Sequence, residues 1–262
     1  MGKRYTQEIL LLIVTLIILI LFNYSFLDES LENFLIDYEE GVVDRVIDGD
    51  TIVINDTTIR MLGINTPERG ERYYEEATEF LENLILNQSV QIIHGKEPID
   101  RYGRTLAYIS KDNENINLEL VEQGYANFYF PSGKDIYYEE FKSAWEICIN
   151  NNIYLCEKSV DVCASCIELK EFGDSDKEVV LYNKCGFECD LTAWTIKDEG
   201  RKKFEIPNFQ LEPYKEIKIK VGQGIDNENV LLWNRTSYVW TSSGDTLFLR
   251  DNYEGLVLWE SY

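Results

Sequence analysis

The sequence has little positive charge and only one histidine. Its 262 residues include 25 lysines and arginines against 47 aspartates and glutamates, for a formal net charge of −22. Tight binding of duplex nucleic acid relies on a basic surface, so this charge argues against a static duplex binder. The single histidine, His94, lies inside an expected strand and away from every motif. We interpret it as structural, which excludes a histidine-based mechanism.

Internal repeats and low-complexity segments are also absent from the sequence. With 45% hydrophobic and 27% charged residues, the chain is not compositionally disordered and can bury one large core or two modest ones. We expect an apolar segment at 1–27 and an acidic linker at 28–40. Two domains are expected to follow, at 41–158 and 163–262.

The N-terminal segment begins with Lys3 and Arg4 and continues into an unbroken apolar run from Ile9 to Phe22. No small-residue cleavage site follows, and the run extended to Leu27 approaches bilayer-spanning length. We therefore expect an uncleaved, single-pass transmembrane helix that anchors the protein in the cell membrane. A cleaved signal peptide, with secretion of the protein, is the alternative. The basic residues before the run place that end in the cytoplasm and the bulk of the chain outside.

Apolar periodicity predicts a chain that is mainly β with some α. Alternation predicts strands at 42–47, 51–54, 57–64, 90–94 and 105–110, and helical spacing predicts helices at 71–86, 118–123 and 135–150. Five short strands with small helices match a partly open β-barrel of the oligonucleotide-binding (OB) type. After Cys156 the helical periodicity disappears and turn signals recur, which predicts a β-sandwich.

Three blocks of sequence are candidates for the chemistry. They read VIDGDTIVI at Val46–Ile54, IRMLGINTPE at Ile59–Glu68 and DRYGRTLAYI at Asp100–Ile109. Together, in this order, they resemble the thermonuclease family of staphylococcal nuclease, which has an OB-fold. The resemblance covers about 115 residues and implies an endonuclease that hydrolyses DNA, RNA or both. It further implies cleavage on the 5′ side that leaves 3′-phosphates, with little base specificity.

By this resemblance the catalytic residues are Arg60, Glu68 and Arg104. The two arginines would clamp the phosphate, because a guanidinium can bond two oxygens at once and keeps its proton. Glu68 would orient or deprotonate the attacking water. The alternative for Arg60 and Glu68 is a simple ion pair between them. Arg101 and Tyr102 match substrate-binding residues of the family.

Calcium (Ca²⁺) is the cofactor that the resemblance implies. Asp50 matches the first ligand, the carbonyl of Thr66 matches another, and Asp48 would lie just outside. The sequence departs from the family at Asn65, where the best-known members have a second carboxylate ligand. An amide oxygen can still coordinate calcium, but the loss of one negative charge should weaken binding.

Two further sets of aromatic residues leave alternatives open. Tyr129 and Phe130 either stack on a base or pack in the core. Trp194, Trp233 and Trp240 belong to the C-terminal half, where we favour core packing over ligand binding.

The C-terminal half resembles a lamin-tail domain, which has an immunoglobulin-like sandwich. The resemblance rests on EVVLYN at Glu178–Asn183, the segment around Trp194, and SGDTLFLRD at Ser243–Asp251. Its role cannot be inferred from the sequence.

Six cysteines lie at the expected domain junction or in the sandwich. Cys163 with Cys166 and Cys185 with Cys189 form two closely spaced pairs, and Cys148 and Cys156 precede them. An extracytoplasmic location favours disulfides, whereas paired spacing also suits a four-thiolate zinc site. Free thiols are the third possibility.

We therefore expect a membrane-anchored, calcium-dependent nuclease whose partner is nucleic acid, with single strands preferred. The alternative is a catalytically weak or inactive surface module. In that case the barrel binds nucleic acid or another partner, and the sandwich mediates adhesion. No protein partner is predicted.

Overall fold

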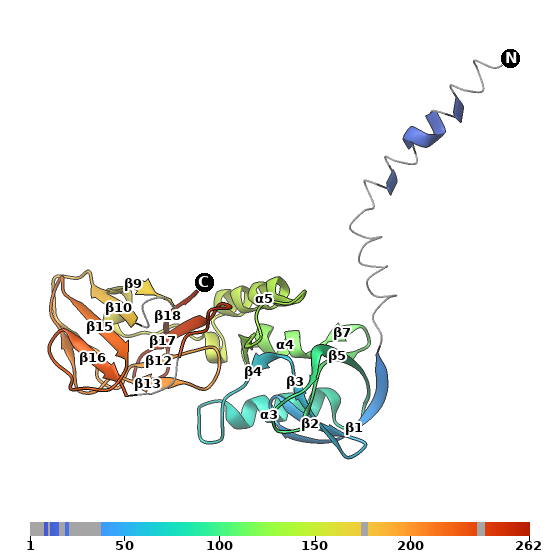
Figure 1. The fold of residues 1–262 in the computed structure, drawn as a ribbon, viewed down its shortest axis with the longest axis horizontal. Coiled ribbons are helices and arrows are strands. Elements are labelled where there is room, and N and C mark those ends of the chain that lie inside the picture. Colours follow the sequence, from blue (N-terminus) through green and yellow to red (C-terminus); the bar gives the residue numbers. More distant parts are fainter. Residues whose placement is uncertain (1–7, 10, 16–18, 21–37, 174–177, 235–238) are drawn as a thin grey trace. The chain divides into compact units, whose positions relative to one another are not determined.

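The computed structural model describes residues 8–9, 11–15, 19–20, 38–173, 178–234 and 239–262 (Figure 1). The chain divides into two units, Met1–Glu39 and Glu40–Tyr262. In the first unit the described residues up to Ile20 are helical, and no helix within the described part of the chain has the length and apolarity needed to cross a membrane. The rest of the expected anchor and most of the expected linker at 28–40 lie outside the described residues.

The N-terminal part of the second unit is built from short strands and three helices. In chain order its elements are β1 (Glu39–Asp48), β2 (Thr51–Ile54), β3 (Thr57–Met61), β4 (Gly63–Asn65), α3 (Tyr74–Ile85), β5 (Ser89–Ile99), β6 (Thr105–Lys111), β7 (Glu114–Asn115), α4 (Ile116–Glu122), β8 (Asn127–Tyr129) and α5 (Tyr138–Asn151).

These strands close into a barrel. The main sheet has the order β3-β2-β1-β5-β6-β7, and β3 also pairs in parallel with β6. That additional pairing joins the two ends of a five-stranded sheet, as the OB-fold prediction requires. Helix α3 packs on the core through Ala77, Leu81 and Ile85, which are fully buried at helical spacing and confirm the predicted apolar face.

The C-terminal part is a β-sandwich. Two short 3₁₀ helices, η1 (Tyr154–Cys156) and η2 (Val162–Ser165), precede its strands, and η1 packs on the core of the barrel. The strands are β9 (Ile167–Phe172), β10 (Glu178–Asn183), β11 (Cys189–Asp190), β12 (Thr195–Lys197), β13 (Lys203–Glu205), β14 (Gln210–Leu211), β15 (Glu216–Val221), β16 (Val230–Trp233), β17 (Thr246–Arg250) and β18 (Leu256–Ser261). One sheet has the order β16-β15-β10-β9 and the other β13-β12-β17-β18. Trp194, Trp233 and Trp240 are buried in its core, as predicted.

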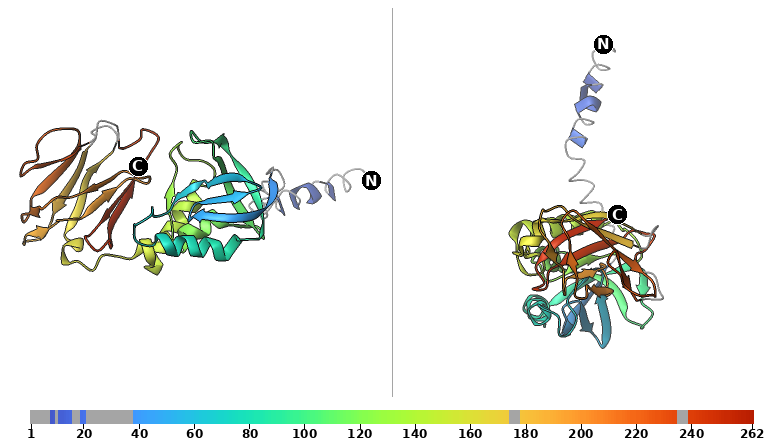
Figure 2. Two further views of the ribbon diagram at one scale, coloured as in Figure 1. Left: turned by 90° about the horizontal axis from the view of Figure 1, so that it is seen from below. Right: turned by 90° about the vertical axis from the view of Figure 1, so that its left-hand side faces the viewer.

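Strand β17 belongs to both hydrophobic cores. Leu247 and Leu249 face the core of the sandwich, whereas Phe248 packs with the barrel residues. This split follows from the alternation of side chains along a strand. The ring of Phe248 lies 5.3 Å from that of Trp145 on α5, in edge-to-face geometry. The sandwich and barrel therefore form one compact unit, in which they lie side by side (Figure 2). Apolar side chains of both pack at their junction.

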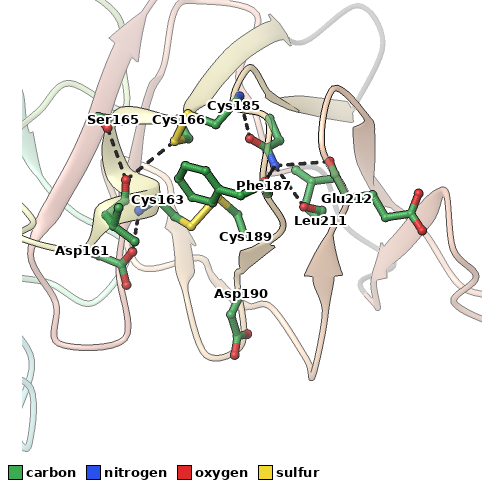
Figure 3. The surroundings of a disulfide bond; sticks show 12 residues. Asp161, Cys163, Ser165, Cys166, Cys185, Phe187, Cys189, Asp190, Leu211 and Glu212 are labelled. Carbon is green, nitrogen blue, oxygen red and sulfur yellow. Dashed lines mark hydrogen bonds between the residues drawn. A yellow bond between two sulfur atoms is a disulfide. The ribbon is translucent and has the colours of Figure 1, made fainter.

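All six cysteines form disulfides, so the zinc and free-thiol alternatives are not realised. Cys148–Cys156 ties the end of α5 to η1. Cys163–Cys189 and Cys166–Cys185 tie η2 to the segment that follows β10 and to β11 (Figure 3). Two of the bonds thus hold the start of the sandwich to its own core, and the third fixes the segment that follows the last barrel helix.

Removing the Cys163–Cys189 bond should destabilise the sandwich. The bond spans 26 residues, and opening a loop of that size costs about 3 kcal/mol through the greater entropy of the unfolded chain. We expect the C163A/C189A variant to unfold at a lower denaturant concentration than the wild type. A reducing agent should then destabilise the wild type more than the variant. Equal stability of the two proteins under oxidising conditions would contradict this account.

Candidate active site

The turn between β1 and β2 places two carboxylates against the loop after β4. The backbone N–H of Asp50 donates to Oδ1 of Asp48 at 3.2 Å, which closes the turn. Gly49 allows a close approach, because a Cβ there would lie 2.9 Å from the Thr66 side chain and 3.0 Å from Ala77 on α3. The turn can therefore lie close to the loop after β4, and the backbone N–H of Thr66 donates to Asp50 Oδ2 at 3.2 Å.

Arg60 lies at the centre of this cluster. Its Nη2 atom is 2.9 Å from Asp50 Oδ2, and the two side chains are only 8% and 4% exposed. The guanidinium also donates to the carbonyls of Met61 and Ile64, at 2.6 and 2.9 Å. Asn65 Oδ1 is a further acceptor at 3.5 Å. A buried charge needs this degree of pairing, and here Asp50, Arg60, Asn65 and Thr66 share one network.

The structure holds Glu68 and Arg104 in separate contacts. Arg104 donates through Nε to Asp100 Oδ2 at 2.8 Å, and its Nη2 is 2.7 Å from the same oxygen. Glu68 is half-exposed and forms an ion pair with Arg201, at 2.5 Å from Nε to Oε1. The alternative of an ion pair between Arg60 and Glu68 is therefore wrong, because each has another partner.

Register nevertheless brings the two arginines to neighbouring strands of the barrel wall. Arg60 on β3 pairs with Leu106 on β6, and the two strands are parallel. Arg104 directly precedes β6, two residues before Leu106.

Two families of known proteins match parts of this chain. Residues 58–147 match the family model described as staphylococcal nuclease homologue, and residues 159–262 match that of the lamin tail domain. A thermonuclease from Staphylococcus intermedius is 36% identical over 146 residues, which cover 50% of this chain and 86% of that protein. A thermonuclease from Staphylococcus hyicus is 33% identical over 161 residues, covering 54% and 91%.

This chain belongs to the staphylococcal nuclease family. Endonuclease YhcR of Bacillus subtilis is also similar, at 34% identity over 125 residues that cover 40% of this chain and 10% of that protein. Membership makes the chain a phosphodiesterase of the nuclease type, with a lamin-tail domain attached.

The lamin-tail domain contributes backbone atoms to the candidate nuclease site, which no sequence motif predicts. The loop between β12 and β13 carries Gly200 and Arg201. Asn65 Nδ2 donates to the carbonyl of Gly200 at 3.0 Å, across 135 residues of chain. A carboxylate in place of Asn65 would bring an acceptor oxygen next to the carbonyl oxygen of Gly200, with no N–H group to donate between them. An amide at position 65 therefore suits the neighbouring carbonyl.

The remaining predicted substrate residues lie on the turn between β5 and β6. Tyr102 is 68% exposed. The guanidinium carbon of Arg101 is 4.8 Å from the centre of its ring, and that of Arg104 is 5.5 Å. Phe130 is buried and packs against α5, so core packing is the outcome there. Tyr129 is half-buried, and a Cβ on Gly200 would lie 3.2 Å from its ring.

The donor set of the cluster fits calcium. The carboxylates of Asp48 and Asp50, the amide oxygen of Asn65 and the carbonyl of Thr66 are hard oxygen ligands. Burial and then the charge of Asp50 raise the pKa of Asp48, and a cation would relieve that repulsion. Within the described residues no three side chains of His, Cys, Asp or Glu form a metal-binding group, so the amide and backbone oxygens would be needed.

Two buried acids support the loop that carries Gly200. Glu199 accepts a hydrogen bond from the backbone N–H of Phe130 at 3.0 Å and contacts the Thr246 hydroxyl at 3.3 Å. Burial, and then the charge of Asp245, raises the pKa of Glu199 to about 8. Burial, and then Asp198, raises the pKa of Asp245 to about 6. Both carboxyl groups therefore keep a proton to higher pH in the folded chain than in the unfolded chain.

Stability should accordingly fall as pH rises from 4.5 to about 8, the interval between the usual and the folded pKa of Glu199. Over this interval the folded chain retains a proton that the unfolded chain releases, and the loss is at most about 1.4 kcal/mol per pH unit. In Glu199→Gln the group cannot ionise, so the pH dependence should be reduced. Chemical denaturation at several pH values measures both proteins, and parallel curves would refute the assignment.

Proposed function

We propose that this nuclease is calcium-dependent and acts outside the cytoplasmic membrane, on single strands of DNA or RNA. The observation that carries the proposal is the buried network of Asp50, Arg60 and Asn65. It joins candidate cation ligands to a candidate phosphate-binding arginine in one set of hydrogen bonds.

The residues of the site have separable tasks in this proposal. Arg60 and Arg104 bind the phosphate oxygens and stabilise the negative charge that develops on them. Glu68 is 45% exposed, so water can reach its carboxylate, and it orients or deprotonates the attacking water. When bound through Asp50, Asn65 and Thr66, calcium supplies additional positive charge and polarises the phosphate.

The proposed location rests on cysteine chemistry and on the apolar segment. Three disulfides and no free cysteine are typical of proteins that fold in an oxidising compartment. The apolar run from Ile9 to Phe22 would anchor or export the chain. Calcium is abundant outside cells, which suits a site with one carboxylate fewer.

The preference for single strands is supported by the turn between β5 and β6. An exposed aromatic ring next to cationic side chains, as at Tyr102, can stack on an unpaired base while the cations approach the backbone. A stacked duplex does not present its bases in this way.

Calcium should be required for degradation of single-stranded DNA by the purified full-length protein, kept in solution with mild detergent. We expect cleavage with calcium and none with chelator. Glu68→Gln and Arg104→Ala should each lower turnover by about 10²–10³-fold, because each removes a group that acts in the transition state. Undiminished turnover of Arg104→Ala would reject its role.

The role of Arg60 is tested with a lysine substitution instead of alanine. Arg60→Ala would leave Asp50 buried without its partner and should cost about 3–5 kcal/mol of stability, so lost activity would be ambiguous. Arg60→Lys keeps the charge and removes the planar fork. We therefore expect Arg60→Lys to stay folded, by circular dichroism, and to lose most of its turnover.

Asn65→Asp should separate calcium binding from domain packing. Without calcium the variant loses the hydrogen bond to Gly200 and should be less stable by about 1–3 kcal/mol. Calcium should raise its thermal midpoint more than that of the wild type, because a second carboxylate strengthens the site. Equal calcium-induced shifts in both proteins would argue against a ligand role for Asn65.

One observation favours the alternative of a binding module. Glu68 is paired with Arg201, and while that pair persists its Oε1 atom is occupied by the guanidinium and cannot accept a proton from the attacking water. The alternative replaces the proposal if, with calcium present, the wild type binds single strands but cleaves them no faster than Glu68→Gln.

A further inference from the structure

The loop between β12 and β13 is fixed on the nuclease barrel by its backbone. Asn127 Nδ2 donates to the carbonyl of Glu199 at 2.8 Å, and Asn65 Nδ2 donates to that of Gly200 at 3.0 Å. Within the loop, the backbone N–H of Lys202 donates to Asp198 Oδ1 at 2.8 Å. The loop is therefore held in place beside the nuclease cluster.

Arg201 is the exposed side chain of this loop. Asp198 and Glu199 are buried, whereas the side chain of Arg201 is 57% exposed. By comparison, the side chains of Arg60 and Arg104 are 8% and 27% exposed. Among these three guanidinium groups, Arg201 is the one that solvent reaches most easily.

The partner of Arg201 is also exposed. Glu68 is 45% exposed, and a pair open to water contributes only about 0–1 kcal/mol. A phosphate offers a guanidinium two charged oxygens in a matching geometry, so it competes well with a single screened carboxylate. The pair can thus be exchanged for a substrate phosphate at little cost.

We propose that Arg201 of the lamin-tail domain is a substrate-binding residue of the nuclease site: it binds a backbone phosphate and thereby releases Glu68. This inference rests on the proposed function. It also accounts for how a chain with a net charge of −22 attracts a polyanion, because the sandwich supplies a cation at the site.

Binding measurements test the proposal without relying on cleavage. Full-length protein in mild detergent and chelator is titrated against a short fluorescent single-stranded oligonucleotide at several salt concentrations. We expect Arg201→Ala to raise Kd about ten-fold and to reduce the slope of log Kd against log salt by about 0.7, the value for one lost phosphate contact on a single strand. Arg201→Lys should keep the slope, with an intermediate Kd.

Lys184→Ala is the matched control. Lys184 pairs with Glu168 in the sandwich at 3.3 Å, and the two side chains are 47% and 40% exposed. The substitution changes the net charge by the same amount, and we expect the salt slope to remain that of the wild type. If Arg201→Ala and Lys184→Ala behave alike while both stay folded, the proposal is overturned.

A double-mutant cycle with Glu68→Gln tests the exchange. Removing the carboxylate frees Arg201, so Glu68→Gln should tighten binding several-fold when Arg201 is present. In the Arg201→Ala background the same change should have a much smaller effect. Equal effects in both backgrounds would mean that Glu68 acts only through general repulsion, and the exchange would be refuted.

Calcium-dependent cleavage distinguishes failure of the inference from failure of the proposed function. If the wild type cleaves and Arg201→Ala has the same KM and the same salt slope, the inference is wrong and the proposed function stands. Tighter binding or faster cleavage by Arg201→Ala would also overturn it, since Arg201 would then restrain the site. A wild type that neither binds nor cleaves would remove the proposed function and the inference together.

Discussion

The site depends on the burial of one guanidinium group against one carboxylate. Arg60 and Asp50 are almost inaccessible to water, and such a pair persists only when its remaining hydrogen-bonding atoms are satisfied. The carbonyls of Met61 and Ile64 meet that need and fix the path of the chain from β3 to β4. Asn65 and Thr66 are positioned as a consequence, so one ion pair organises the candidate cation ligands.

A second constraint comes from the packing of the lamin-tail domain. Because β17 is buried on both faces, the sandwich cannot pivot away without exposing Phe248 and part of the barrel core. The β12–β13 loop therefore stays beside Asn65 and Glu68. The sandwich is better described as a wall of the nuclease site than as a tethered module.

Much of the fold could be predicted because its signals are local. Helix α3 and strand β2 follow from periodicity, and Asp48-Gly49-Asp50 follows from turn chemistry. The candidate cation ligands lie within the sequence motifs. The contacts of Asn65 and Glu68 with the sandwich could not be predicted, because they join residues more than a hundred positions apart and depend on how two domains pack. The sequence predicts a weakened ligand at Asn65, whereas the amide also serves that packing.

A crystal structure of Glu68→Gln with calcium and a short single-stranded oligonucleotide tests the central claim most directly. The account predicts calcium on oxygen atoms of Asp50, Asn65 and Thr66, with a phosphate of the oligonucleotide within hydrogen-bonding distance of Arg60. Calcium bound elsewhere, or a phosphate distant from Arg60, would contradict it.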